Sequence, residues 1–220
     1  MMTPHAGYRD NFLALKDSLP GARLPWVKQL RTQAIEAFMD TGLPTTRNEA
    51  WKYTDLRSLA RKHFSHPAAP SHLDKALLSH WTWGDAPVHR LVFVDGRYIP
   101  DFYPFRQMLN GVILTSLATA LAEHPEELEA VLGRCTDLEA PGFNAFNTAF
   151  MCDGAYIRLG QGAVVEHPIH LLFVSTGQRD AMATVRNLIV AEAGSAATVI
   201  ESWVTLADAD YLTSTVTEIL

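Results

Sequence analysis

The first third of the chain carries apolar residues at helical spacing. The clearest helix is predicted over 26–41, where the apolar positions recur every three or four residues: Trp26, Leu30, Ala34, Ile35 and Phe38. Gly42 can adopt the left-handed conformation that closes a helix, and Pro44 prevents the helix from continuing. The same criteria predict shorter helices over 8–19, 49–63, 73–80 and 125–132.

A second helix start is predicted just after this stop. Thr46 and Glu49 have the spacing of a capping box, in which each side chain binds a free backbone amide at the start of a helix. On this interpretation Thr46 is the N-cap of the helix over 49–63, and replacing it with alanine should cost about 1 kcal/mol of stability.

From residue 90 onward the pattern changes to short apolar runs separated by turns. The run 90–94 predicts a buried strand, Asp95-Gly96 predicts a hairpin turn, and 97–99 predicts the returning strand. Another strand is expected over 111–115.

The last part of the chain repeats weakly. Residues 156–163 align with 188–196 at a spacing of roughly 32 residues, and 216–220 begins a third copy. Each copy also contains a second apolar strand, at 169–174 and 198–204. Stacked repeats would bury these apolar faces against one another. A β-sandwich is also built from short strands and turns, and periodicity alone favours neither architecture.

Five segments together resemble the SufB/SufD family of iron–sulfur cluster assembly scaffolds. They occur in the family's order, from about Pro25 to the last residue, and the tryptophan-containing first segment is more similar to the SufD branch. The segments are Trp51–Leu56 within the stretch 42–59, Phe143–Phe150, Asp153–Ile157, His167–Leu171 and Arg186–Val190.

This resemblance implies a mainly β fold. We expect a helical domain over 1–88, followed over 89–220 by the start of a right-handed parallel β-helix with helical insertions. Family members are about twice as long, so the resemblance implies a truncated chain without the later coils and the C-terminal helical domain. The open end of the β-helix is then expected to fray or to associate with another copy.

Composition limits the function classes. The chain has 220 residues, 48% hydrophobic and 19% charged, with a formal net charge of −6, so it lacks the basic footprint of a nucleic-acid-binding protein. No apolar run is long enough to span a bilayer, and residues 1–10 do not have the pattern of a secretory signal. We therefore expect a cytoplasmic protein.

Two histidine pairs were considered as metal ligands. His167 and His170 are three apart in a predicted strand, so their side chains should point to opposite faces. His63 and His66 have helical spacing, but Pro67 disfavours helix at His66, which favours two solvent-facing side chains.

The two cysteines do not form a recognisable cluster site. Cys135 and Cys152 are not part of a C-x-x-C pair, and iron–sulfur sites need several thiolates. In the resembled family, the cysteine and histidine implicated in cluster assembly lie near the end of the β-helix, so the resemblance assigns no such role to any residue here. The metal ligands stay unknown. Trp51 and Tyr53 are more economically interpreted as core anchors than as a binding motif.

The sequence also lacks hydrolytic signatures, because it contains no G-x-S-x-G, H-E-x-x-H or phosphate-binding G-x-x-x-x-G-K-[ST] motif. The resemblance implies a non-catalytic scaffold without a cofactor of its own, joined to a SufB-like paralogue and a SufC-like ATPase. Binding of the ATPase itself is expected to need the missing C-terminal region.

Two alternatives come from other classes. A plain interaction module is one, and a carbohydrate-active β-helix enzyme such as a polysaccharide lyase is the other. The lyase would require charged residues to converge on one strand face, with these candidates: Arg158, Glu166, Arg186, Glu192 and Glu201.

Overall fold

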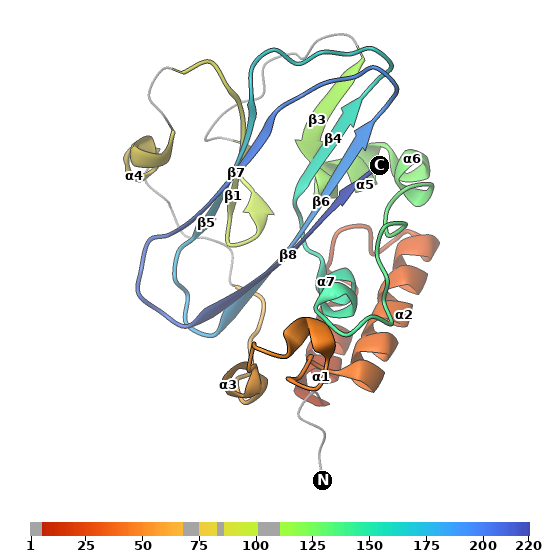
Figure 1. Ribbon diagram of the computed structural model, residues 1–220, viewed down its shortest axis with the longest axis vertical. Helices are drawn as coiled ribbons and strands as arrows, with labels where there is room; N and C mark the ends of the chain where they lie inside the picture. The colour runs from red at the N-terminus through yellow and green to blue at the C-terminus, as the bar shows by residue number, and fades with distance from the viewer. Residues whose placement is uncertain (1–5, 68–74, 83–85, 101–110) are drawn as a thin grey trace.

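Two β-sheets stand side by side, with helices gathered mainly at one end and along one sheet (Figure 1). The computed structural model describes residues 6–67, 75–82, 86–100 and 111–220. The helices are α1 (Ala6–Leu15), α2 (Pro25–Thr41), η1 (Glu49–Trp51), α3 (Arg57–Ala60), α4 (Lys75–Leu78), η2 (Ser79–Trp81), α5 (Leu117–Glu123), α6 (Pro125–Glu129) and α7 (Asn144–Phe150). The strands are β1 (His89–Val94), β2 (Arg97–Tyr98), β3 (Val112–Ser116), β4 (Ala155–Leu159), β5 (Ile169–Ser175), β6 (Ala181–Ala191), β7 (Val199–Thr205) and β8 (Tyr211–Ile219).

The long helix predicted over 26–41 is confirmed as α2. Its buried face includes Ala34, Ile35 and Phe38, as the spacing requires. Gly42 closes the helix with φ 65° and donates its N–H to the Phe38 carbonyl at 2.8 Å. The predicted helix over 8–19 is present as the earlier and shorter α1, and the described part of the predicted helix over 73–80 forms α4 and η2.

The capping box at Thr46 and the helix over 49–63 are wrong. The segment contains only the single turn η1 and the short α3, and η1 begins without a side-chain cap. The turn before it is held instead by Asn48, whose Oδ1 accepts the Thr45 N–H at 2.8 Å. The Asn48 side chain, as a local hydrogen-bond acceptor, stabilises this turn in place of the predicted helix start.

We therefore expect Asn48→Ala to lower the free energy of unfolding by about 1 kcal/mol, since it removes this hydrogen bond. Thr46→Ala is the matched control and should change it by less than about 0.5 kcal/mol. Urea denaturation of the two variants distinguishes them. A larger loss for Thr46→Ala would restore the original capping interpretation.

Each sheet has four strands and combines parallel with antiparallel pairs. The orders are β2-β1-β5-β7 and β3-β4-β6-β8, and β1–β2 and β3–β4 are the antiparallel pairs. Asp95 (φ 48°) and Gly96 (φ 79°) make the predicted hairpin turn between β1 and β2. From β4 onward the chain passes from one sheet to the other at every strand.

The weak repeat correctly aligned residues that pair in the structure. Tyr156 pairs with Leu188 across the parallel strands β4 and β6, and Leu188 pairs with Glu218 across β6 and β8. The same relation holds in the other sheet, where Ile169 of β5 pairs with Val199 of β7.

The fold class drawn from this repeat is nevertheless wrong. The prediction was a mainly β protein with a right-handed parallel β-helix over 89–220, but the strands form two separate mixed sheets, neither closed nor wound into a solenoid. Helices also occupy a share of the chain similar to that of the strands. The repeat identifies which strands are neighbours. Strand pairing alone does not determine whether the sheets close around a shared interior. The division at residue 88 stays a prediction.

The helical end of the molecule and the sheets share one hydrophobic cluster. Tyr8 of α1, Phe38 of α2 and Phe146 of α7 pack with ring centroids 5.2–5.9 Å apart, and Met182 of β6 joins the same cluster. Most of the segment 143–150 forms the helix α7. All but its first residue are buried. Its polar residues Asn144, Asn147 and Thr148 recur at helical spacing, and Asn147 and Thr148 make buried hydrogen bonds to β6 and β8.

Candidate functional site

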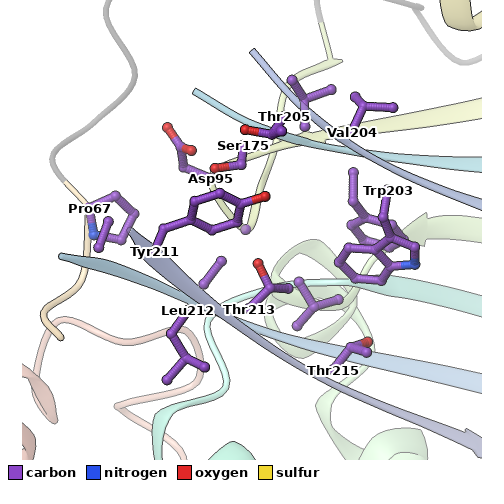
Figure 2. A pocket seen from close by; sticks show the side chains of 16 residues that line it. Pro67, Asp95, Ser175, Trp203, Val204, Thr205, Tyr211, Leu212, Thr213 and Thr215 are labelled. Carbon is purple, nitrogen blue, oxygen red and sulfur yellow. The ribbon is translucent and has the colours of Figure 1, made fainter. Parts of the chain in front are cut away.

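A cavity of about 410 Å³ lies between the two sheets, bordered by β5 and β7 on one side and by β6 and β8 on the other. Figure 2 shows Trp203 of β7 on one wall and Thr213 and Thr215 of β8 on the other. Its size is within the range of small-molecule and peptide pockets. The small side chains Ala181 and Ala183 on β6 leave the space unfilled.

A column of aromatic rings crosses β1, β5 and β7, and its last two rings line the cavity. Phe93, Phe173 and Trp203 occupy paired positions on β1, β5 and β7. The Phe93 and Phe173 centroids are 4.9 Å apart, and those of Phe173 and Trp203 are 4.0 Å apart with an interplanar angle of 11°. Trp203 ends the column and is 41% exposed, so the last ring of the stack faces solvent.

The polar groups at the cavity are mostly engaged with the protein. The carboxylate of Asp95 accepts hydrogen bonds from the Thr176 N–H at 2.8 Å, the Thr176 hydroxyl at 2.6 Å and the Gln178 amide at 3.1 Å. These bonds tie the β1–β2 turn to the segment after β5. The cavity is therefore an apolar and hydroxyl-lined hollow rather than a charged one.

Two unpaired strand edges border the cavity. Within the described part of the chain, β7 pairs only with β5 and β8 only with β6. The exposed large side chains at these edges are Trp203 and, on β8, Ile219 at 66%. Unpaired backbone amides and carbonyls beside apolar side chains are a template for another strand.

A buried ion pair holds the edge strand β8 in place. The Nη2 of Arg186 lies 2.7 Å from Oε1 of Glu218, and the two side chains are 0% and 1% exposed. The Glu218 carboxylate also accepts the backbone N–H groups of Gly133 and Cys135, at 2.9 and 3.0 Å. Burial lowers the pKa of Arg186, and the Glu218 charge counteracts that shift.

The structure separates His167 from His170, as their spacing predicted. His170 is fully buried; its Nδ1 accepts from the Arg90 Nε at 2.9 Å, and its Nε2 lies 3.0 Å from the Ser202 hydroxyl. Since arginine only donates, the imidazole proton is on Nε2. Burial and the neighbouring Arg90 charge lower the pKa of His170 to about 4. His167 is exposed and contacts the ring of His89 instead.

The pKa of His170 gives a testable pH dependence. Between pH 6.5 and about 4 the unfolded chain binds a proton at this imidazole and the folded chain does not, so the free energy of unfolding should fall as pH decreases through this window. The slope for one histidine is at most about 1.4 kcal/mol per pH unit. We expect His170→Gln to show a weaker pH dependence in urea denaturation at pH 7.5, 5.5 and 4.5. If the free energy of unfolding depended on pH equally in the variant and the wild-type protein, the titrating group would be a residue other than His170.

The two histidines of the second pair, His63 and His66, differ in burial. His63 is exposed, as predicted, but the prediction of a solvent-facing His66 is wrong. The Nε2 of His66 is buried without a hydrogen-bond partner, and its ring lies 6.2 Å from that of Phe150. Burial, together with Arg97 and Arg31, lowers the pKa of His66 to about 4. The helix α3 ends at Ala60, so the two residues do not share a helix face.

The two cysteines lie in different environments. Cys152 is buried, with its Sγ 3.1 Å from the Gly96 carbonyl oxygen, and burial raises the pKa of its thiol. Cys135 is exposed. Over the residues that the structure describes, no group of three or more His, Cys, Asp or Glu side chains is arranged to hold a metal ion.

Trp51 and Tyr53 also differ from each other in burial. Trp51 packs on Phe143 with centroids 5.6 Å apart and donates its indole N–H to the Pro141 carbonyl at 3.2 Å, so it anchors this segment from a partly exposed position rather than from the core. Tyr53 is 93% exposed, so the prediction that it is a core anchor is wrong.

The charged residues considered for a polysaccharide lyase do not converge. Arg158 pairs with Glu192 at 2.9 Å on the outside of the molecule, Arg186 is buried against Glu218, and Glu201 accepts from the Asn187 amide at 3.1 Å. They therefore form separate contacts rather than one catalytic face.

Comparison with known proteins decides the family. A family model described as the SufBD protein N-terminal region matches residues 2–171. The chain belongs to the SufBD family. An iron–sulfur cluster assembly SufBD family protein of Synechocystis sp. is 31% identical over 79% of this chain and 38% of its own length. The iron–sulfur cluster assembly protein SufD of Escherichia coli is 27% identical over 82% of this chain and 40% of its own, and that of Bacillus subtilis 26% over 81% and 41%.

The match confirms the resemblance to the SufB/SufD family. The chain spans about two-fifths of the length of these SufBD relatives. None of the helices in the described ranges is long and apolar enough to cross a membrane.

Proposed function

We propose that this protein is a SufD-like, non-catalytic subunit that supports iron–sulfur cluster assembly and iron acquisition. The observation that carries this proposal is the SufBD family match over residues 2–171, which includes the helical end, α7 and the first strands of both sheets. Its partners would be a SufB-like paralogue and a SufC-like ATPase, and ATP hydrolysis would belong to the latter. The protein would act in the cytoplasm, where reduced cysteines such as the free Cys135 and Cys152 persist.

The rim of the inter-sheet cavity supports the scaffold role over an enzymatic one. It presents two strand edges and the outer face of Trp203, which are features that bind protein strands. Of the candidate lyase residues only Glu201 lies on this rim, where it accepts the Trp203 indole N–H at 3.3 Å, while Arg158 and Glu192 pair with each other and Arg186 is buried against Glu218.

Reconstitution tests the proposal. The full chain is combined with a SufB-like paralogue and a SufC-like ATPase of the same source, and co-purification and cluster formation are followed by visible absorbance. We expect the chain alone to hydrolyse neither ATP nor polyuronate, and to co-purify with the SufB-like paralogue but not with the isolated SufC-like ATPase. Polyuronate cleavage by the chain alone would replace the proposal with the lyase alternative, and failure to co-purify with the paralogue would reject the subunit role.

We also propose that the open edges pair with a second copy of the chain. Neither β7 nor β8 carries Lys, Arg or Pro, the residues that usually block edge pairing, and both edges are bordered by exposed apolar side chains. A two-fold axis perpendicular to the sheets would set β7 against β7 and β8 against β8, both antiparallel, and would close the two cavities against each other.

We expect the isolated chain to sediment as a dimer whose dissociation is concentration-dependent. Introducing one positive charge at each edge, in the variant Trp203→Lys/Ile219→Lys, should make it monomeric. Tyr53→Lys is the control, since Tyr53 is an exposed aromatic residue away from both edges. A strict monomer before any substitution, or a dimer that survives the double variant, would reject the edge-pairing proposal.

A further inference from the structure

Two histidines that are far apart in the sequence meet at the start of two neighbouring strands. His89 is the first residue of β1, and His167 lies just before β5. The parallel register pairs His89 with Ile169, and the His89 N–H donates to the Pro168 carbonyl at 2.9 Å. The backbone on both sides of this contact is therefore fixed by the β1–β5 ladder.

The separation of the two rings suits a shared ion. Their centroids are 6.1 Å apart and their planes are inclined by 45°. A transition-metal ion bound about 2.1 Å from an imidazole nitrogen lies roughly 3.2 Å from the ring centre, so two rings on one ion have centres about 5.2 Å apart at the tetrahedral angle and at most about 6.4 Å apart when they lie on opposite sides of it. A tetrahedral ion would therefore require side-chain rotations that bring the two ring centres about 1 Å closer together.

The site is open to solvent. His167 is exposed and His89 is partly exposed, so an ion held between them would keep water or another exchangeable ligand on its remaining positions. Within the described ranges, no third His, Cys, Asp or Glu completes a closed set of ligands. An incomplete protein ligand set is typical of exchangeable rather than structural ions.

We propose that His89 and His167 bind a divalent first-row transition-metal ion of the Zn²⁺ or Ni²⁺ type at the start of β1 and β5. Imidazole nitrogen suits these borderline ions, whereas Mg²⁺ and Ca²⁺ require oxygen ligands and are excluded. The site is separate from the inter-sheet cavity and from the buried Arg186–Glu218 pair. It does not depend on the scaffold role proposed above.

Isothermal titration of the full chain with NiCl₂ at pH 7.5 tests the site, and we expect one ion per chain. His89→Gln and His167→Gln should each weaken binding by on the order of tenfold or more. The double variant should be no weaker than either single one, because a lone histidine no longer chelates. Circular dichroism verifies that the variants fold, and long-range ¹H–¹⁵N spectra should show that the ion perturbs only these two rings.

The control variants are His63→Gln and His80→Gln, which remove exposed histidines elsewhere on the molecule. They should leave the affinity unchanged. Wild-type affinity in the double His89/His167 variant, a loss of affinity in the control variants as large as in His89→Gln or His167→Gln, or no binding to the wild-type chain would each overturn the proposal. Competition by MgCl₂ at equal concentration would also overturn it, since imidazole does not bind that ion well.

Discussion

Glu218→Ala is expected to lower the free energy of unfolding by about 3–5 kcal/mol, the usual result of removing one partner of a buried ion pair. Arg186 would keep a charge inside the protein at 0% exposure, and the N–H groups of Gly133 and Cys135 would lose their acceptor. Because a small domain is stable by only about 5–15 kcal/mol, this loss is a large part of the total. Urea denaturation measures it directly.

Two comparison variants show whether the loss comes from the buried charge. Glu218→Gln keeps the shape and an acceptor oxygen and should cost less than Glu218→Ala. Glu192→Ala removes the partner of Arg158, a pair with 38% exposure on both sides, and should cost under about 1 kcal/mol. If Glu218→Ala were no more destabilising than Glu192→Ala, the Arg186 network would not be what holds β8 to the rest of the molecule.

Gly154→Ala is expected to be at least as damaging, with a loss above about 4 kcal/mol or no folded protein at all. A Cβ at this position would lie 2.1 Å from the Arg186 carbonyl oxygen, where no real contact is that short. The backbone cannot move away, because Gly154 has φ 156° and its own carbonyl accepts the Leu117 N–H at 2.7 Å. Substitutions with this effect are uncommon and indicate a specific steric cause.

The matched control for this variant is Gly162→Ala. Gly162 also has a positive φ, 69°, but a Cβ there would meet nothing within 4 Å. Gly162→Ala should therefore lower the free energy of unfolding by only about 1–2 kcal/mol, the cost of a left-handed backbone conformation for a residue with a Cβ. Comparing the two variants by urea denaturation or by soluble yield isolates the contact with Arg186. Equal losses for both would mean that conformation rather than the close approach decides the effect.

The local sequence determined the features that rest on neighbouring residues. The apolar spacing in 26–41 specified α2 because a helix repeats every 3.6 residues, and Gly42 ended it because it can adopt a positive φ. Asp95-Gly96 specified the β1–β2 turn for the same conformational reason. The weak repeat specified that Tyr156 lies beside Leu188, since equivalent apolar strands pair in register. The family was also recognisable from five short segments and is confirmed by the match over 2–171.

Only the tertiary structure decided the features that depend on distant residues. The burial of α7 could not be read from its sequence, because Asn147 and Thr148 are polar residues that are nevertheless fully buried, with hydrogen bonds to β6 and β8. The repeat could not show whether the strands wind around one interior or form two open sheets, since both arrangements bury the same apolar faces. The Arg186–Glu218 pair, the cavity below Trp203 and the meeting of His89 with His167 arise from contacts between segments far apart in the chain. Such contacts are set by packing and register, which no single segment of sequence encodes.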